Sequence, residues 1–443
     1  MTSIGLRSLL ALGILATWTA VAPAEDWMHW RGPHYNGSSD ETGLPDTWST
    51  TDNVRWVADL PGPSAATPII SGDHVFVSST APDRNQLVAL CLDRNSGKIL
   101  WQHDVATPMA RPRDPRSTYS AASPVTDGKI VVFFYGSGKM AAFDYVGTQL
   151  WKRDIEEEYG QFAFQWTFAS TPLLHDGKLY LQVLQRNEPV GPYAAGRQDI
   201  DSYLLAMEPA TGKTLWQHVR PSDAYMESRE AYSSPIPFTH DGRPEILIVG
   251  GDCISGHDPG TGAELWRWGT WNPERIGHWR LVPSPVAGAG VVLACGPKGS
   301  PICAVKAGGQ GTLDDSGLAW TSEGQREVSA DVPTPAFYDG DFFVLNDLRG
   351  VLSRVAPTTG EVKWKLDLGS REKFEASPLA VDGKIYCINF AGEVVVVEAA
   401  SGKVLNTIPM AEREESPVRS TIAVAHGNLF VRTNDKLYCI GAK

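Results

Sequence analysis

The sequence lacks most of the motifs that mark a known catalytic or metal-binding site. It has no Cys-x-x-Cys-His for a c-type haem, no His-Glu-x-x-His, no EF-hand loop, no Gly-Lys-Ser/Thr phosphate loop and no Gly-x-Ser-x-Gly elbow. Its ten histidines fall singly, which is typical of structural or surface roles. Long charge blocks are absent too. The formal net charge is −12, and an acidic chain without basic tracts argues against nucleic acid as a partner.

Long apolar runs are also absent, apart from one at the start of the chain. The run LLALGILA follows Arg7 and precedes Ala22-Pro23-Ala24, a small-x-small cleavage pattern. It is too short for a spanning helix, so it predicts a signal peptide over residues 1–24, cleaved after Ala24, and a periplasmic or secreted protein. The first cysteine is Cys91, so we expect no lipid anchor at the cleavage point, and no transmembrane segment.

Cysteine is scarce for a secreted chain, with six residues at 91, 253, 295, 303, 387 and 439. They are not set at the spacings of a disulfide framework. Cys295 and Cys303 could bridge one hairpin, or all six could be buried free thiols that act as small hydrophobic groups.

No segment shows sustained helical periodicity; a repeat of short strands stands in its place. Ser or Thr followed by Pro, an apolar run and a turn recurs seven times, with prolines at 68, 124, 172, 235, 285, 335 and 378. An eighth copy, STIAVAHGNLFV from Ser420, lacks the Pro. The spacing runs from 43 residues (335 to 378) to 63 residues (172 to 235), which indicates a propeller or a solenoid.

A second phrase interleaves with the first and completes a four-stranded unit. A Gly turn is followed by an apolar residue and Trp, as in EPATGKTLW, while Asp-Gly between apolar runs marks the other hairpin. The eighth unit lacks its outer strand, which residues Val54 to Leu60 can supply. We therefore predict an all-β fold, an eight-bladed β-propeller of four-stranded antiparallel blades closed by the N-terminal strand. The predicted boundaries are a signal peptide (1–24), an N-terminal extension (25–52) and the propeller (53–443).

These motifs resemble the repeats of the pyrroloquinoline-quinone (PQQ) quinoprotein propellers and of the outer-membrane assembly factor of the BamB type. The stretch DWMHWRGPHYNGSSDETGLPDTWS looks like a secreted subfamily of PQQ-like repeat proteins. The resemblance covers nearly all of residues 25–443. In the family, the Trp of each motif packs between neighbouring blades, which implies this blade-docking role for Trp56, Trp101, Trp151, Trp216, Trp266, Trp320 and Trp364.

The resemblance leaves two functions open. Enzymes of the family hold PQQ beside calcium and commonly carry adjacent cysteines, whereas this sequence has no Cys-Cys pair and no haem motif. We therefore expect a non-catalytic binding or scaffold protein with no cofactor, no metal site and no turnover of alcohols. The alternative is a PQQ-dependent oxidoreductase of alcohols or sugars that uses PQQ with calcium.

The candidate binding surface lies where the long loops gather. B–C loops and D–A connections lie on one face of a propeller, and most long segments here are of these two kinds. The residues just before each Ser/Thr-Pro are rich in charge and aromatic rings. They predict a site for an envelope or extracellular protein, or a carbohydrate, at Arg116, Tyr119, Trp166, Arg229, Tyr232, His278, Arg280, Asp331 and Arg419.

Overall fold

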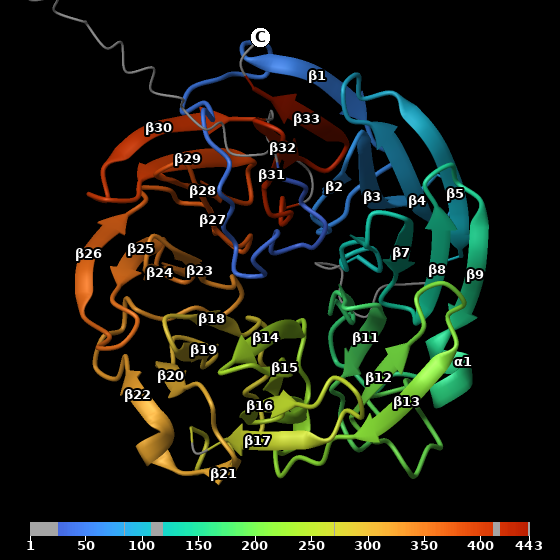
Figure 1. The fold of residues 1–443 in the computed structure, drawn as a ribbon, viewed down its shortest axis with the longest axis vertical. Helices are drawn as coiled ribbons and strands as arrows, with labels where there is room; N and C mark the ends of the chain where they lie inside the picture. Colours follow the sequence, from blue (N-terminus) through green and yellow to red (C-terminus); the bar gives the residue numbers. More distant parts are fainter. Residues whose placement is uncertain (1–24, 84, 108–117, 270, 411–416, 442–443) are drawn as a thin grey trace, which may run out of the picture.

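Eight β-sheets stand around a central axis, as Figure 1 shows for the computed structural model. The structure describes residues 25–83, 85–107, 118–269, 271–410 and 417–441. Seven sheets have four strands and one has five. Within the described ranges the only α-helix is α1 (Ile155–Tyr159), besides two short 3₁₀ turns, η1 (Met226–Arg229) and η2 (Asp315–Gly317). The predicted eight-bladed propeller is confirmed.

Each blade follows the A-B-C-D order expected from its two hairpins. The first four blades comprise β2 (Ile69–Ser71), β3 (His74–Ala81), β4 (Gln86–Asp93), β5 (Ile99–Ala106); β6 (Val125–Thr126), β7 (Ile130–Phe134), β8 (Lys139–Asp144), β9 (Gln149–Asp154); β10 (Leu173–His175), β11 (Lys178–Val183), β12 (Tyr203–Met207), β13 (Thr214–Val219); and β14 (Ile236–His240), β15 (Arg243–Gly250), β16 (Cys253–His257), β17 (Glu264–Trp268).

The last four blades comprise β18 (Val286–Gly288), β19 (Val291–Cys295), β20 (Ile302–Lys306), β22 (Leu318–Thr321); β23 (Ala336–Tyr338), β24 (Asp341–Asn346), β25 (Val351–Val355), β26 (Val362–Asp367); β27 (Leu379–Val381), β28 (Lys384–Ile388), β29 (Glu393–Glu398), β30 (Val404–Pro409); and β31 (Ala423–Ala425), β32 (Asn428–Arg432), β33 (Lys436–Ile440), β1 (Val54–Asp59). The fifth strand of blade 4 is β21 (Gly311–Leu313), which pairs in parallel with β17.

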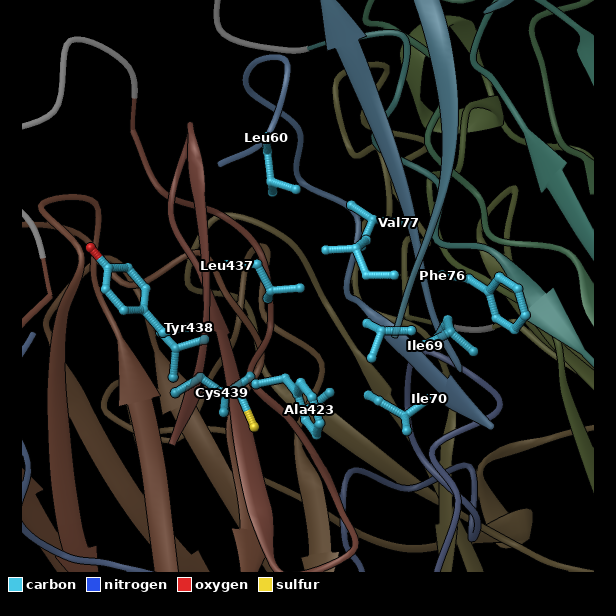
Figure 2. Packing of buried hydrophobic residues seen from close by; sticks show 14 of the residues in the cluster. Leu60, Ile69, Ile70, Phe76, Val77, Ala423, Leu437, Tyr438 and Cys439 are labelled. Atoms are coloured by element: carbon cyan, nitrogen blue, oxygen red, sulfur yellow. The ribbon is translucent and has the colours of Figure 1, made fainter. Parts of the chain in front are cut away.

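The ring closes through β1, which pairs antiparallel with β33 from the other end of the chain. Its inward side chains, Val54, Trp56 and Ala58, are buried, while those between them are exposed. Leu437 of β33 and Ile69 of β2 belong to one apolar cluster that joins blades 8 and 1 (Figure 2). Closure removes the free edge that blade 8 would otherwise expose.

The repeated tryptophans lie between neighbouring blades. Trp151 at the outer edge of blade 2 covers Gly212 in the C–D turn of blade 3, where an added Cβ would lie 2.7 Å from the indole. Gly212 also has a φ of +70°, so the turn requires glycine for two reasons. The same indole-over-glycine contact recurs for Trp56, Trp101, Trp216, Trp320 and Trp364.

Two junctions depart from this pattern. The indole of Trp266 donates to Glu245 of its own blade, 2.6 Å away. At the junction of blades 7 and 8 the Trp is replaced by Asn406, whose Nδ2 donates to Thr47 Oγ1 at 2.6 Å. Blade 8 has no continuous C–D turn, because its outer strand comes from the N-terminal end of the chain. The N-terminal extension therefore packs where the indole lies in other blades.

The N-terminal extension covers the opening of the ring on the side of the A–B turns. Trp27 pairs with Ile70 on β2 through two backbone bonds of 2.9 Å, and the Gly37 carbonyl accepts the Ala380 N–H of β27 at 2.9 Å. The segment therefore joins the inner strands of blades 1 and 7, which flank blade 8, and its blue ribbon runs down toward the centre of the ring in Figure 1. As a result, this end of the central channel is closed.

The remaining predictions concern the membrane, the thiols and the leader. No helix in the described ranges is long and apolar enough to cross a bilayer. All six cysteines are free and buried, which settles the open alternative in favour of small hydrophobic groups. The predicted signal peptide, residues 1–24, lies outside the described residues.

Candidate functional site: an axial cavity

A ring of eight hydroxyl groups surrounds the axis, one at the start of each inner strand: Thr67, Ser123, Thr171, Ser234, Ser284, Thr334, Ser377 and Thr421. At seven junctions the backbone N–H of one ring residue donates to the hydroxyl oxygen of the next, over 2.8–3.3 Å. The Ser/Thr of the repeated phrase therefore links the blades. Within the described ranges no ring hydroxyl donates a hydrogen bond to the protein. Their protons remain available to a ligand.

A second tier of side chains stands above this ring and completes a cavity of about 250 Å³. Its members are the residues two positions before each ring hydroxyl: Ala65, Ala121, Ala169, Tyr232, Val282, Val332, Glu375 and Arg419. Six of these equivalent positions carry uncharged groups. Glu375 and Arg419 are the only charged residues among the described residues that line the cavity. The repeat symmetry is thus broken by charge in one sector, at blades 7 and 8.

The charged sector is a well-defined ion pair. Arg419 Nε donates to Glu375 Oε2 at 2.8 Å, and both side chains are about one-fifth exposed. The Arg419 guanidinium also lies over the Phe390 ring, 4.7 Å from its centroid. Glu375 Oε1 has no hydrogen-bond partner in the described part of the chain, so one carboxylate oxygen is held while the other is free to accept.

Tyr232 is held in the opposite wall by a closed polar network. Its hydroxyl accepts the Trp166 N–H at 3.1 Å and donates to the Glu230 carboxylate. Glu230 is fully buried and also accepts from Arg186 Nε and from the Gln165 N–H. Burial raises the pKa of Glu230, while the bonds from Tyr232 and Arg186 oppose that shift. This network fixes the orientation of Tyr232.

The N-terminal extension contributes to the lining and to the charge behind it. Trp30 lines the cavity, and its indole N–H is buried without a partner. Arg31 follows, fully buried, with its Cζ 5.3 Å from the centroid of the Trp30 ring. Its guanidinium donates to the carbonyls of Pro335 and Pro378, 2.6 and 3.3 Å away. These prolines directly follow two residues of the hydroxyl ring.

The structure brings only part of the predicted binding set to the cavity. Tyr232 and Arg419 line it. Tyr119 is 3% exposed and belongs to the core beneath blades 1 and 2. Arg229 Nη1 donates to backbone carbonyls of its own loop. Arg116 lies outside the described residues.

The other predicted residues lie at the rim or at the surface. Arg280 stacks on Trp166, 5.8 Å from the ring centroid, and lies 3.6 Å from a carboxylate oxygen of Asp331. Arg280 also lies 3.8 Å from Glu227, whose carboxylate accepts the Trp166 indole N–H at 3.0 Å. His278 is exposed. Arg280, Glu227 and Asp331 therefore form a cluster at the rim, held together largely by attraction between opposite charges.

Sequence reasoning missed the parts of the cavity that matter most. Glu375 was one charged residue among many before the Ser/Thr-Pro phrases, and the extension held no visible signal for Trp30 and Arg31. An alignment of the eight repeats on their Ser/Thr residues would have found the charged pair in the lining. Comparing the residue two positions before each Ser/Thr singles out Glu375 and Arg419, because the other six positions are uncharged.

One family model and two known proteins match this chain over substantial parts of its length. The family model described as outer membrane protein assembly factor BamB matches residues 47–185 and 201–443. Two curated relatives are polyvinylalcohol dehydrogenases. The one from Pseudomonas sp. is 28% identical over 170 residues, and the one from Sphingopyxis sp. (strain 113P3) is 27% identical over 271 residues. These matches cover 37% and 55% of this chain, and 24% and 39% of the relatives, so the chain spans well under half of their length.

A solved structure shows the same fold. The quinohemoprotein alcohol dehydrogenase from Comamonas testosteroni is similar with a TM-score of 0.63 at 14% identity, over 96% of this chain and 82% of that one. At this identity the likeness concerns the fold alone.

Two expectations are corrected by the curated relatives. We expected a non-catalytic binding or scaffold protein with no cofactor, but both relatives are dehydrogenases, which need an electron acceptor. The wrong expectation rested on the absent cysteine pair and haem motif, and the absence of a motif does not exclude an activity. The family model matches most of the chain and the eight blades carry its repeats. The chain therefore belongs to the PQQ-like β-propeller family described as outer membrane protein assembly factor BamB.

Proposed function

We propose that this chain is a quinoprotein-type oxidoreductase that oxidises alcohols in its axial cavity, with PQQ as electron acceptor. The observation that carries the proposal is the charged sector at Glu375 and Arg419 in a wall that is otherwise uncharged. The kinship with polyvinylalcohol dehydrogenases supports the substrate class. A secreted or periplasmic location, as expected from the leader, suits a polymer that cannot enter the cell.

The lining residues fit a planar quinone that carries carboxylates. Small apolar side chains such as Ala169 and Val282 leave room for a flat ring, and Trp30 adds an aromatic surface. The ring hydroxyls and Arg419 provide the donors that carboxylate oxygens need. When bound, the quinone supplies a two-electron acceptor.

The lining fits calcium less well. Calcium takes roughly six to eight oxygen ligands in proteins. The described lining offers one carboxylate, Glu375, and one amide, Asn434, and the carboxylate is paired with Arg419. The proposed reaction therefore assigns no role to a metal ion.

In the proposed reaction, the residues of this chain remove one proton from the alcohol. Oxidation of an alcohol to a carbonyl removes a hydride from carbon and a proton from oxygen. Glu375 Oε1 is placed to accept that proton, because Arg419 holds Oε2 and Oε1 has no partner among the described residues. Arg419 is a positioning residue in this scheme.

The test measures dye reduction by the mature chain, residues 25–443, supplied with PQQ and calcium. The substrates are polyvinyl alcohol and small secondary alcohols. We expect turnover, and we expect Glu375→Gln to lower kcat about 10²- to 10⁴-fold, since general base catalysis contributes about that much. PQQ affinity should stay within a few-fold, because Gln retains the shape of the side chain.

The matched control is Glu372→Gln, three residues earlier and exposed, which should keep full activity. Two results would overturn the proposal. One is full activity in Glu375→Gln. The other is PQQ that binds to the wild-type chain without any oxidation of alcohols.

A further inference from the structure

Every outer strand of the ring has a β-bulge at one equivalent position, the residue directly before the junction Trp or its replacement. In blade 1, Trp101 lies opposite Cys91 and Ile99 lies opposite Leu92, which leaves Leu100 as the extra residue. The same irregularity recurs in the other seven blades. A bulge turns the side chain of the extra residue away from the regular pleat. From blade 1 to blade 8, the extra residues are Leu100, Leu150, Leu215, Leu265, Ala319, Lys363, Leu405 and Arg55.

These eight residues fall into three groups. In blades 4 and 7 the chain itself lies at the outer edge, and the leucine is half-buried. Strand β21 extends the sheet of Leu265, and Leu405 packs against the apolar cluster that includes Trp48 of the N-terminal extension. Blades 5, 6 and 8 have a small or charged residue instead. In blades 1–3 the position holds a leucine that is 41–51% exposed.

The exposed leucines belong to a larger apolar surface. We call it the outer wall of blades 1–3 and define it as Ile99, Leu100, Leu150, Leu215 and Val219. These are five of the seven large apolar side chains that are exposed on outer strands in the described ranges. Their strands β5, β9 and β13 follow one another along one side of the ring (Figure 1). Single exposed apolar side chains are normal, whereas a group on adjoining elements is typical of an interaction surface.

The outer wall also has free backbone groups. Strands β5, β9 and β13 each end their sheet, so the N–H and C=O groups on their outer side pair with no strand among the described residues. Blade 4 shows how such an edge accepts a strand. Beyond its bulge, β17 pairs in parallel with β21 over three residues, from Trp266 opposite Gly311 to Trp268 opposite Leu313. The equivalent stretches of the outer wall are 101–103, 151–153 and 216–218.

The charge around the outer wall favours an acidic partner. An exposed lysine lies within two residues of each bulge leucine: Lys98, Lys152 and Lys213. Lys98 and Lys213 make no ion pair within the part of the chain that the structure describes, and Lys152 Nζ donates to the Val105 carbonyl at 2.6 Å. A second copy of this chain would bring its own lysines to the same contact. A partner with carboxylates would compensate them.

We propose that the outer wall of blades 1–3 is a docking surface for another protein, which adds an extended segment with apolar and acidic side chains to these free edges. The segment pairs beyond the bulge, as β21 does in blade 4, and its apolar side chains cover the bulge leucines. The surface is continuous with the pair of β17 and β21, because blade 4 follows blade 3. Backbone pairing supplies the affinity, and the leucines and lysines supply the specificity.

The experiment uses the chain of residues 25–443 and a probe peptide, acetyl-TLTETLTET-amide, which has apolar and acidic side chains at alternate positions of one face. Fluorescence anisotropy measures binding at neutral pH, and hydrogen exchange read by mass spectrometry shows which strands the peptide protects. We expect saturable binding below millimolar concentration. Exchange should slow in β5, β9 and β13, because an added strand takes up their outward N–H groups.

Two control peptides separate backbone pairing from charge. The first is the same peptide with N-methyl groups on alternate amides, which keeps the side chains but prevents strand pairing along that edge. The second, acetyl-TLTKTLTKT-amide, reverses the charge. Each should bind at least about tenfold more weakly than the probe peptide.

The variants test the leucines without disturbing the core. Leu100→Ser, Leu150→Ser and Leu215→Ser, combined in one chain, should weaken the probe peptide on the order of tenfold. The Tm should stay nearly unchanged, because these side chains are on the surface. The matched control is Leu348→Ser. Leu348 is 47% exposed in the turn between β24 and β25 of blade 6, so this variant should bind like the wild type.

Four results would overturn the inference. They are no binding at millimolar concentration, equal binding of the N-methylated peptide, unchanged binding by the triple variant, and protection confined to other strands. Dimerisation of the wild-type chain that the triple variant loses would assign the surface to a second copy and also overturn the proposal. None of these measurements involves PQQ or an alcohol, so their outcome is independent of the proposed function.

Discussion

Trp151 provides the sharpest test of how the blades are held together. Its indole is 9% exposed, covers Gly212 of blade 3 and donates from Nε1 to the Pro209 carbonyl at 2.7 Å. Trp151→Ala removes a buried ring between two rigid sheets, which costs about 3–5 kcal/mol of unfolding free energy. Loss of the hydrogen bond adds about 1 kcal/mol. We therefore expect a loss of about 4–6 kcal/mol.

The assay is urea unfolding followed by circular dichroism, with the slope of the transition compared between variants. Trp151→Phe keeps most of the apolar contact but removes the indole N–H, so it should cost about 1–3 kcal/mol. The control is Leu150→Ala on the same strand. Leu150 is 41% exposed and faces away from the blade interface, so its loss should change stability by less than about 0.5 kcal/mol. Equal costs for Trp151→Ala and Leu150→Ala would refute the docking role.

Two further predictions concern closure and pH. Deletion of residues 25–60 removes β1, so the thermal unfolding transition should broaden and move to lower temperature; an unchanged Tm would contradict closure through β33. Burial raises the pKa of Asp347 to about 6, so folding favours its protonated form and stability is lost as pH rises from about 4 through 6. Asp347→Asn should therefore stabilise the protein by about 2–3 kcal/mol at pH 8 and hardly at pH 4, and an equal gain at both pH values would exclude this cause.

The local patterns were sufficient to predict the blades. Asp-Gly and Thr-Gly turns define hairpins through backbone geometry that neighbouring residues control, and β-branched runs favour strands. The missing outer strand of the eighth repeat, together with Val54 to Leu60, predicted the closure that β1 and β33 make. Because these features repeat, the strand and turn pattern of one copy supports the same pattern in the other copies. The parallel strand β21 was not predicted, because the sequence of an insertion does not show which sheet edge it will join.

The candidate site depended on distances that the sequence does not contain. The sequence alone determined the eight-bladed ring and the place of Ser/Thr at the start of each inner strand. Only the tertiary structure showed that Glu375 and Arg419 form a pair in one sector, and that Arg31 reaches two blades more than 300 residues later in the chain. The physical reason is that closing the ring brings together residues from all eight blades, and burial then decides which charges remain uncompensated.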